Sequence, residues 1–391
     1  MINNFQPYNH DKQSGRILFI DLMRAYAILM MIQGHVIDTF INPVYRNPEN
    51  WIYSLWNHMR GITAPVFFFS AGAIFSYLLL RNNLPLKDNK RFYKGIKRVF
   101  VLLFIGYFLR FNPHMLLNWK NFDFYDYKRS FGVDALHCIA IGLGLIIISY
   151  VLNRLTRIPV WIYYLIFAFM SFYLYPSVVK AQWSEILPLP LADYFTKEYG
   201  SAFPVIPWIG FVMWGALPGY ILSKKAKLAS NNIFAAGALL LGIILVHYSG
   251  DELARVFRMT NDENFHYLSQ DNFLYYHLGN IFIVLGILAI VANLVKIPEI
   301  VISVGKNTLL IYVVHVFVIY DTGYNIGLQH YFGNSLSPYQ AVTAAIMLLF
   351  FFILLVYLRE KWKKNLKNKF REYFRNKLIA VQNNVKAKNS D

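Results

Sequence analysis

An arginine and a histidine lie eleven residues apart in an apolar stretch near the start of the chain, RILFIDLMRAYAILMMIQGHVIDTF, as Arg24 and His35. On an α-helix, eleven steps of about 100° make about three turns, so both side chains share one face, about 16 Å apart along the axis. Asp38 follows His35 by three positions, within side-chain reach on a helix. Because a carboxylate there would stabilise a protonated imidazole, His35 and Asp38 are candidate catalytic residues that take a proton from a substrate.

Ionisable side chains inside an apolar span are costly, and they usually face a cavity, a partner or a substrate path. A structural interpretation stays open for each of them. Asp21 lies three positions before Arg24, so the two residues are also candidates for a structural ion pair near the membrane interface. A packed histidine that is merely hydrogen-bonded is the alternative interpretation of His35.

Basic residues recur at three- and four-residue spacing in KDNKRFYKGIKRVF, where the third apolar run begins. On a helix this spacing gives one basic face, which suits phosphate groups. Lipid headgroups and the excess of basic residues on the cytoplasmic side of membranes explain the same pattern. The residues concerned are Arg91, Lys94, Lys97 and Arg98.

Three further polar residues in apolar runs are candidate contacts to a substrate or to an oxyanion: Ser70, Tyr312 and His315. Tyr312 and His315 are three positions apart and share a helix face. Ser70 begins the small-residue segment SAGA, for which close helix packing is the leading interpretation. No metal is predicted, because the chain has one cysteine, Cys138, and no H-x-x-x-H or H-E-x-x-H pair.

The candidate residues lie in apolar runs, so the elements that position them are expected to be helices that cross a membrane. Of the 391 residues 57% are hydrophobic and only 15% are charged, whereas soluble domains have roughly 25% charged residues. A spanning helix needs roughly 20 mostly apolar residues. We therefore predict an all-α, polytopic integral membrane bundle in one domain, residues 1–358, followed by a basic cytoplasmic tail, residues 359–391. The ten predicted spans are 17–40, 61–80, 96–116, 132–152, 159–175, 205–222, 232–249, 273–295, 301–321 and 340–358.

The distribution of basic residues sets the predicted orientation. If the N-terminus is cytoplasmic, most of the 38 Lys and Arg residues fall in cytoplasmic segments of the ten-span arrangement. Both termini are then cytoplasmic, and the net charge of +17 reflects topology rather than nucleic-acid binding. The lipid bilayer is thus a predicted partner, nucleic acid is not, and the oligomeric state stays open. The largest predicted outer loops are 41–60, 176–204 and 250–272.

Four segments in order resemble the transmembrane acyltransferase superfamily, which includes acyltransferase family 3 and the heparan-alpha-glucosaminide N-acetyltransferases. The first is Arg24-AYAILMMIQG-His35, an arginine followed after ten residues by a histidine. PVFFFSAG, KRFYKGIKR and GKNTLLIYVVH are similar to later family segments. The departures from the family pattern are Ala71 inserted between Ser70 and Gly72, Lys94 or Lys97 replacing an arginine, and Thr308 where serine is common.

The resemblance implies a membrane-bound acyltransferase that moves an acyl group, often acetyl, from cytoplasmic acyl-CoA to a sugar hydroxyl or amine on the outer side. It implies acetyl-CoA or another acyl-CoA as donor, a glycan or glycolipid as acceptor, and the inner membrane of a bacterium as location. His35 would be the catalytic histidine, and Arg24, Lys97 and Arg98 would contact the donor. It stays open whether His35 acts as a base or carries the acyl group itself.

Two other functions fit the same residues. A proton-coupled secondary transporter of an anionic or sugar substrate would also use Arg24, His35, Arg110 and His315 inside the bundle. The two halves of the chain show no repeat relation, which many transporters have. A non-catalytic scaffold or sensor would need none of these residues for chemistry.

Overall fold

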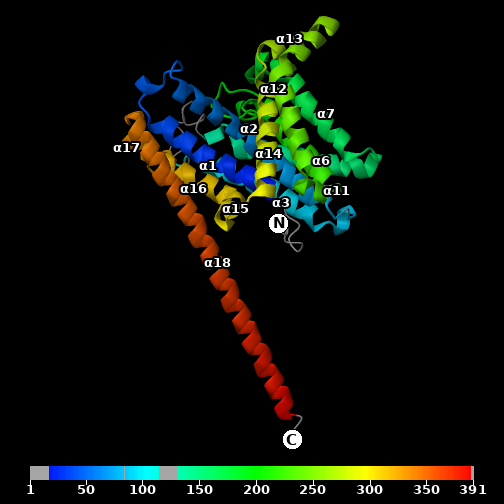
Figure 1. Cartoon of the computed structure of the whole chain (residues 1–391), viewed down its shortest axis with the longest axis vertical. Coiled ribbons are helices and arrows are strands. Elements are labelled where there is room, and N and C mark those ends of the chain that lie inside the picture. The colour runs from blue at the N-terminus through cyan, green and yellow to red at the C-terminus, as the bar shows by residue number, and fades with distance from the viewer. Residues whose placement is uncertain (1–16, 83, 114–129, 389–391) are drawn as a thin grey trace, which may run out of the picture.

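The computed structural model describes residues 17–82, 84–113 and 130–388 of the chain. Throughout these residues the bundle is built of helices (Figure 1), and the β-type pairing among them is limited to an isolated bridge between Ile41 and Leu336. The prediction of an all-α fold is therefore confirmed.

In the described part of the chain, nine longer helices, together with the pair α15 and α16, form the bundle. They are α1 (Leu18–Phe40), α2 (Trp51–Leu80), α3 (Lys90–Arg110), α6 (Ala135–Thr156), α7 (Val160–Tyr173), α11 (Val205–Lys224), α12 (Asn232–Thr260), α14 (Phe273–Leu294), α15 (Glu299–Lys306), α16 (Thr308–Ile319) and α18 (Pro338–Lys388). Short helices connect them: α8 (Tyr175–Lys180), α9 (Trp183–Ile186), α10 (Leu189–Ala192), α13 (Glu263–Gln270) and α17 (Leu328–Phe332).

Each of the ten predicted apolar runs coincides with one of these long helices, or with the pair α15 and α16. Among the described residues, seven helices are long and apolar enough to cross a membrane, and the pair α15 and α16, bent by 74°, makes eight if it is one span. The remaining two are α7, which has 14 residues, and α3, whose first turns are basic. The membrane bundle is thus confirmed, whereas the count of ten spans and the cytoplasmic termini stay predictions.

The segment 250–272, which we expected to be a polar loop, is mostly helical. α12 runs on to Thr260, and α13 follows after two residues. Leu253 and Leu268 are buried in these polar helices, and the Tyr173 hydroxyl donates a 2.6 Å hydrogen bond to Asp262 between them. This bond lowers the pKa of the Asp262 carboxyl from its ordinary value. Hydropathy missed the extension because it reports burial in lipid rather than helix formation.

Close packing of α2 against α11 lies at the centre of the bundle. A Cβ atom added at Gly72 would lie 1.9 Å from the carbonyl oxygen of Val212, and one at Gly215 would lie 1.9 Å from that of Phe69. The two backbones are therefore in contact, which requires residues without a side chain. This is the role expected for the small-residue segment that begins at Ser70.

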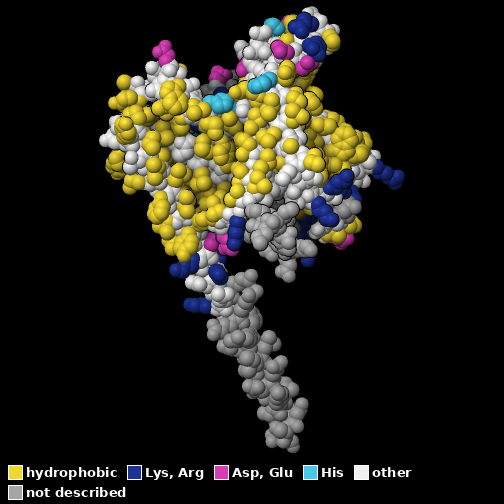
Figure 2. Space-filling view, viewed as in Figure 1, with side chains coloured by type: hydrophobic (Ala, Val, Ile, Leu, Met, Phe, Trp, Pro, Cys, Tyr) yellow, Lys and Arg dark blue, Asp and Glu magenta, His cyan; other side chains and the backbone are white. Residues whose placement is uncertain are grey.

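The surface of the bundle has the distribution of side chains that a membrane requires. On the face shown in Figure 2, hydrophobic side chains form a broad band across the bundle, with charged side chains gathered at its two ends. Lys and Arg dominate the end from which α18 projects, while both signs of charge occur at the other end, where Arg255 and Arg258 of α12 lie near Glu263 of α13. Exposed apolar residues such as Ile233, Leu240 and Phe350 lie on the outer helices, where lipid would cover them.

The last helix passes without a break through the predicted boundary between membrane domain and tail. α18 extends over 51 residues and leaves the bundle well before its end (Figure 1). Only its Pro338–Leu366 part is apolar enough to span a membrane. The division into 1–358 and 359–391 stays a prediction, and residues 389–391 lie outside the described part of the chain.

We predict that Gly215→Ala lowers the thermal stability of the protein, because the new methyl group would collide with the backbone of α2. Overpacking of this kind costs about 1–3 kcal/mol. Gly237→Ala is the matched control, since a Cβ there meets no atom within 4 Å, and it should leave stability equal or slightly higher. Thermal unfolding in detergent, followed by tryptophan fluorescence, measures both; equal melting temperatures would contradict the packing argument.

Candidate active site

Arg24 and His35, on the shared face of α1, line two different cavities. Arg24 lines a cavity of about 620 Å³, named the arginine cavity, and His35 lines one of about 550 Å³, named the histidine cavity. The walls of both are built from α1, α2, α3, α6 and α16. The face predicted from the spacing thus connects two spaces that follow each other along the same helices.

The arginine cavity is strongly basic at one end and apolar elsewhere. Its described lining contains no Asp or Glu, and apolar residues of α2 and α6, such as Ile74 and Leu143, form the rest of the wall. Arg24 is fixed by a 2.6 Å hydrogen bond from Nη2 to the Thr308 hydroxyl, the position where the related segments have serine. Such a cavity suits a ligand that carries several negative charges and an apolar part. Its cationic lining residues are Arg24, Arg91, Lys94, Arg98, Lys306 and Arg359.

The basic face of α3 contributes three residues to this cavity, but not the full predicted set. Arg91, Lys94 and Arg98 line it at three- and four-residue spacing. Lys97 precedes Arg98 by one position, which turns its side chain about 100° around the helix; it is exposed and lines neither cavity. A contact between Lys97 and a donor therefore stays a prediction.

The break between α15 and α16 brings two distant cations to the same cavity. Asn307, at the break, donates to the Ser303 carbonyl at 2.8 Å and to Glu360 at 3.1 Å, and its oxygen accepts a hydrogen bond from Arg359. These bonds tie the start of α16 to α18. Lys306 and Arg359, more than fifty residues apart in the chain, consequently face one space.

In the histidine cavity, His35 is held by two aromatic residues. Its Nδ1 atom lies 2.7 Å from the Tyr320 hydroxyl, and its ring stacks on that of His315 at 5.3 Å between centroids and 23° between planes. His315 is buried, and its Nδ1 has no hydrogen-bond partner among the described residues. With Nδ1 engaged, Nε2 is the atom of His35 left for a substrate in the cavity.

Asp38 is paired with an arginine rather than hydrogen-bonded to His35. Arg60 on α2 makes a 2.7 Å ion pair with its carboxylate, and the side chains are 37% and 36% exposed. The backbone carbonyl of Asp38 also accepts a 2.8 Å hydrogen bond from Arg46. Arg60 itself lines the histidine cavity, so Asp38 acts on the cavity through the position of Arg60. A direct catalytic role for Asp38 stays a prediction.

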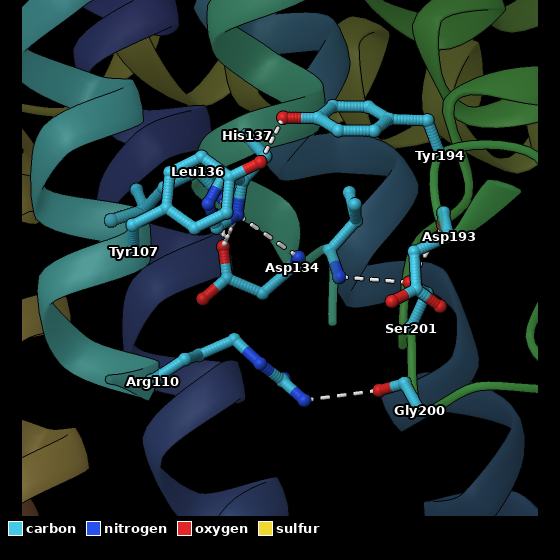
Figure 3. Close-up of polar contacts among 10 residues, drawn as sticks. Tyr107, Arg110, Asp134, Leu136, His137, Asp193, Tyr194, Gly200 and Ser201 are labelled. Carbon is cyan, nitrogen blue, oxygen red and sulfur yellow. Dashed lines mark hydrogen bonds and ion pairs between the residues drawn. The ribbon is translucent and has the colours of Figure 1, made fainter. Parts of the chain in front are cut away.

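A network of polar groups, shown in Figure 3, adjoins the histidine cavity at Asp134. Asp134 caps the start of α6 by accepting from the Leu136 amide at 2.9 Å, and it lies 3.0 Å from Nδ1 of His137. The ring of His137 packs against Tyr107, whose hydroxyl lies 2.5 Å from that of Tyr194. Asp134 lines the cavity, whereas His137 is buried behind it and has a capping role.

The connection from α10 to α11 is held against this network. Arg110 at the end of α3 donates to the Gly200 carbonyl at 3.0 Å, and the Ser201 hydroxyl accepts from the Val133 amide at 2.8 Å (Figure 3). These contacts place Phe203 in the cavity wall beside Arg110. The histidine cavity therefore carries both signs of charge, in contrast to the arginine cavity.

Of the three predicted contacts to a substrate or an oxyanion, two lie in the histidine cavity and one does not. Tyr312 and His315 line the histidine cavity, as their shared face predicts. Ser70 is fully buried, bonds to the Phe67 carbonyl of its own helix at 3.1 Å, and lines neither cavity. Within the described residues no three His, Cys, Asp or Glu side chains form a group that could hold a metal ion.

Sequence reasoning missed Tyr320 and Arg60. Tyr320 is the last residue but one of the ninth apolar run, five positions after His315, and the three- and four-residue spacing of helix faces does not link the two. Arg60 was assigned to a loop because the second run was taken to begin at 61. The helix begins at Trp51 instead, where the Asn50 side chain caps it by accepting from two backbone amides.

A bundle that keeps basic and histidine side chains in two cavities between membrane-spanning helices is typical of integral membrane enzymes and transporters. A family model narrows this class: the one described as heparan-alpha-glucosaminide N-acetyltransferase, catalytic, matches residues 16–264, well over half of the chain. The protein belongs to this family of membrane acetyltransferases. No curated protein and no solved structure matches the chain.

We predict that Tyr320→Phe lowers kcat for acetyl transfer about tenfold with little change in KM, because the buried Nδ1 atom of His35 loses its partner, a cost of about 1–3 kcal/mol. The acid limb of the pH–rate profile should also shift. Tyr339→Phe on α18, which is 89% exposed, is the control and should behave as wild type. An unchanged kcat and profile in Tyr320→Phe would exclude this positioning role.

Proposed function

We propose that the protein transfers an acetyl group from cytoplasmic acetyl-CoA, held in the arginine cavity, to a sugar amine or hydroxyl in the histidine cavity on the outer side. One observation carries the proposal. A cavity lined by six cations and a cavity centred on a histidine lie in succession along the same five helices. Family membership supplies the acetyltransferase class. The acceptor would be a glycan or glycolipid, and the location the inner membrane of a bacterium.

The donor fits the arginine cavity by charge and by shape. Acyl-CoA carries a pyrophosphate and a further phosphate at one end and an uncharged arm that ends in the thioester. Arg24, Arg91 and Arg98 offer forked guanidinium groups, which bind phosphate oxygens in pairs. Toward α2 and α6 the cavity becomes apolar, which suits the uncharged arm. The surface end with the basic residues is the end that the positive-inside rule assigns to the cytoplasm.

In the proposed reaction, His35 carries one proton from the acceptor to the leaving thiolate. Nε2 takes a proton from the acceptor amine or hydroxyl, whose nitrogen or oxygen attacks the thioester carbonyl carbon. The carbon–sulfur bond breaks, and the CoA thiolate receives the proton from His35. For this role Nδ1–H donates to the Tyr320 oxygen, which leaves the lone pair on Nε2. The same geometry also allows Nε2 to accept the acetyl group first and pass it to the acceptor.

Further side chains line the cavity beside His35 and would act on the charges that form or on the acceptor. His315 lines the cavity, and its Nδ1 has no hydrogen-bond partner among the described residues; as the Nδ1–H tautomer it would donate to a carbonyl oxygen that becomes negative. Tyr312 packs edge-on against it at 5.1 Å. Arg60 and Asp134 on the opposite helices would bind hydroxyl groups of a sugar from two sides.

We predict that His35→Ala lowers acetyl transfer by about 10²–10⁴-fold, the usual contribution of a general base. Inverted vesicles receive labelled acetyl-CoA outside and glucosamine inside, and labelled N-acetylglucosamine is measured. His247→Ala, on the exposed face of α12, is the control with wild-type activity. Near wild-type transfer by His35→Ala would end the assignment of His35. Accumulation of intact substrate without acetylated product would indicate a transporter instead.

We predict that Arg98→Ala raises KM for acetyl-CoA about tenfold or more, because a charge-assisted hydrogen bond contributes about 1.5–3 kcal/mol. Lys90→Ala is the matched control, two turns earlier on α3, exposed and outside both cavities, and its KM should stay within about twofold of wild type. Steady-state kinetics with varied acetyl-CoA measures both. Equal effects of the two substitutions would show that bulk charge, rather than this cavity, attracts the donor.

A further inference from the structure

One side chain belongs to both cavities. Phe67 on α2 is the described residue that the arginine cavity and the histidine cavity have in common. It is 9% exposed. Toward the arginine cavity, Ala71 and Ile74 follow it on α2, and toward the histidine cavity, Ala64 and Thr63 precede it. Phe67 therefore stands at the level where one space ends and the other begins.

The ring of Phe67 is held in place by a second ring from the opposite helix. Tyr312 on α16 stacks on it, with 6.4 Å between centroids and 9° between planes. Tyr312 contacts His315 edge-on, and His315 stacks on His35. A continuous series of four rings thus runs from the boundary between the cavities to the catalytic histidine.

We propose that Phe67, supported by Tyr312, is an aromatic partition that sets which acyl groups can be transferred. This inference rests on the proposed acetyl transfer. The phosphates of the donor are held near Arg24, whereas His35 lies about 16 Å further along α1. The thioester end must therefore pass Phe67, and the space beside the ring limits the acyl chain that passes with it.

The same partition restricts water. A thioester that meets water at His35 is hydrolysed: the water oxygen attacks the carbonyl carbon, the carbon–sulfur bond breaks, and acetic acid and the CoA thiol are released. A bulky ring between the two cavities keeps the thioester away from the histidine cavity until the arm is fully seated. Apolar side chains around an active site serve this purpose by excluding water.

The test compares Phe67→Ala with wild type, using acetyl-, butyryl- and hexanoyl-CoA as donors and glucosamine as acceptor. Removal of the ring should raise the ratio of kcat/KM for butyryl-CoA to that for acetyl-CoA by about tenfold or more, in line with the discrimination that one or two methylene groups allow. Release of CoA thiol without acceptor should rise as well. Phe75→Ala, two turns further along α2 and in the arginine cavity alone, should leave the ratio unchanged.

The outcomes separate this inference from the function on which it rests. If wild type acetylates glucosamine but Phe67→Ala keeps the wild-type donor ratio and the wild-type release of thiol, the partition is refuted and the function stands. If wild type transfers no acetyl group to any sugar amine or hydroxyl offered, the proposed function fails first. If Phe67→Ala does not fold, Phe67→Leu keeps an apolar side chain and gives the same comparison with a smaller expected increase.

Discussion

The register between α1 and α16 is the constraint on which the site depends. Two hydrogen bonds fix it: Arg24 donates to Thr308 at one end, and His35 bonds to Tyr320 at the other. Eleven residues separate the pair on α1 and twelve separate their partners, so the two segments run in the same direction at nearly the same rise. A shift of one turn would separate both polar side chains from their partners inside an apolar bundle, which is costly.

The bundle places two different electrostatic environments one after the other. The arginine cavity concentrates positive charge with no described carboxylate in its wall, while the histidine cavity combines Arg60 and Arg110 with Asp134 and Asp321. The first suits a polyanion, and the second suits an uncharged or mixed-charge polar molecule. One set of helices thus forms two cavities of different electrostatic character.

Helix positions and the shared face of Arg24 and His35 were predictable, because apolar length and helical period are local properties of the sequence. Contacts between distant segments were not. Tyr320 meets His35 across 285 positions, and Arg60 takes the carboxylate of Asp38 that spacing had assigned to His35. The sequence predicted the basic segment as a whole. It does not specify how α3 is rotated about its axis, and this rotation turns Lys97 away from the arginine cavity.

The common direction of α1 and α16 also restricts how the chain is threaded. Two parallel segments in a membrane require an odd number of crossings between them. Among the described residues, seven longer helices lie between α1 and the pair α15 and α16 in chain order, and five of these are long and apolar enough to cross. By parity α3 and α7 must then cross together or not at all. α3 lines both cavities. Whether the short helix α7 crosses the membrane therefore depends on whether α3 crosses it.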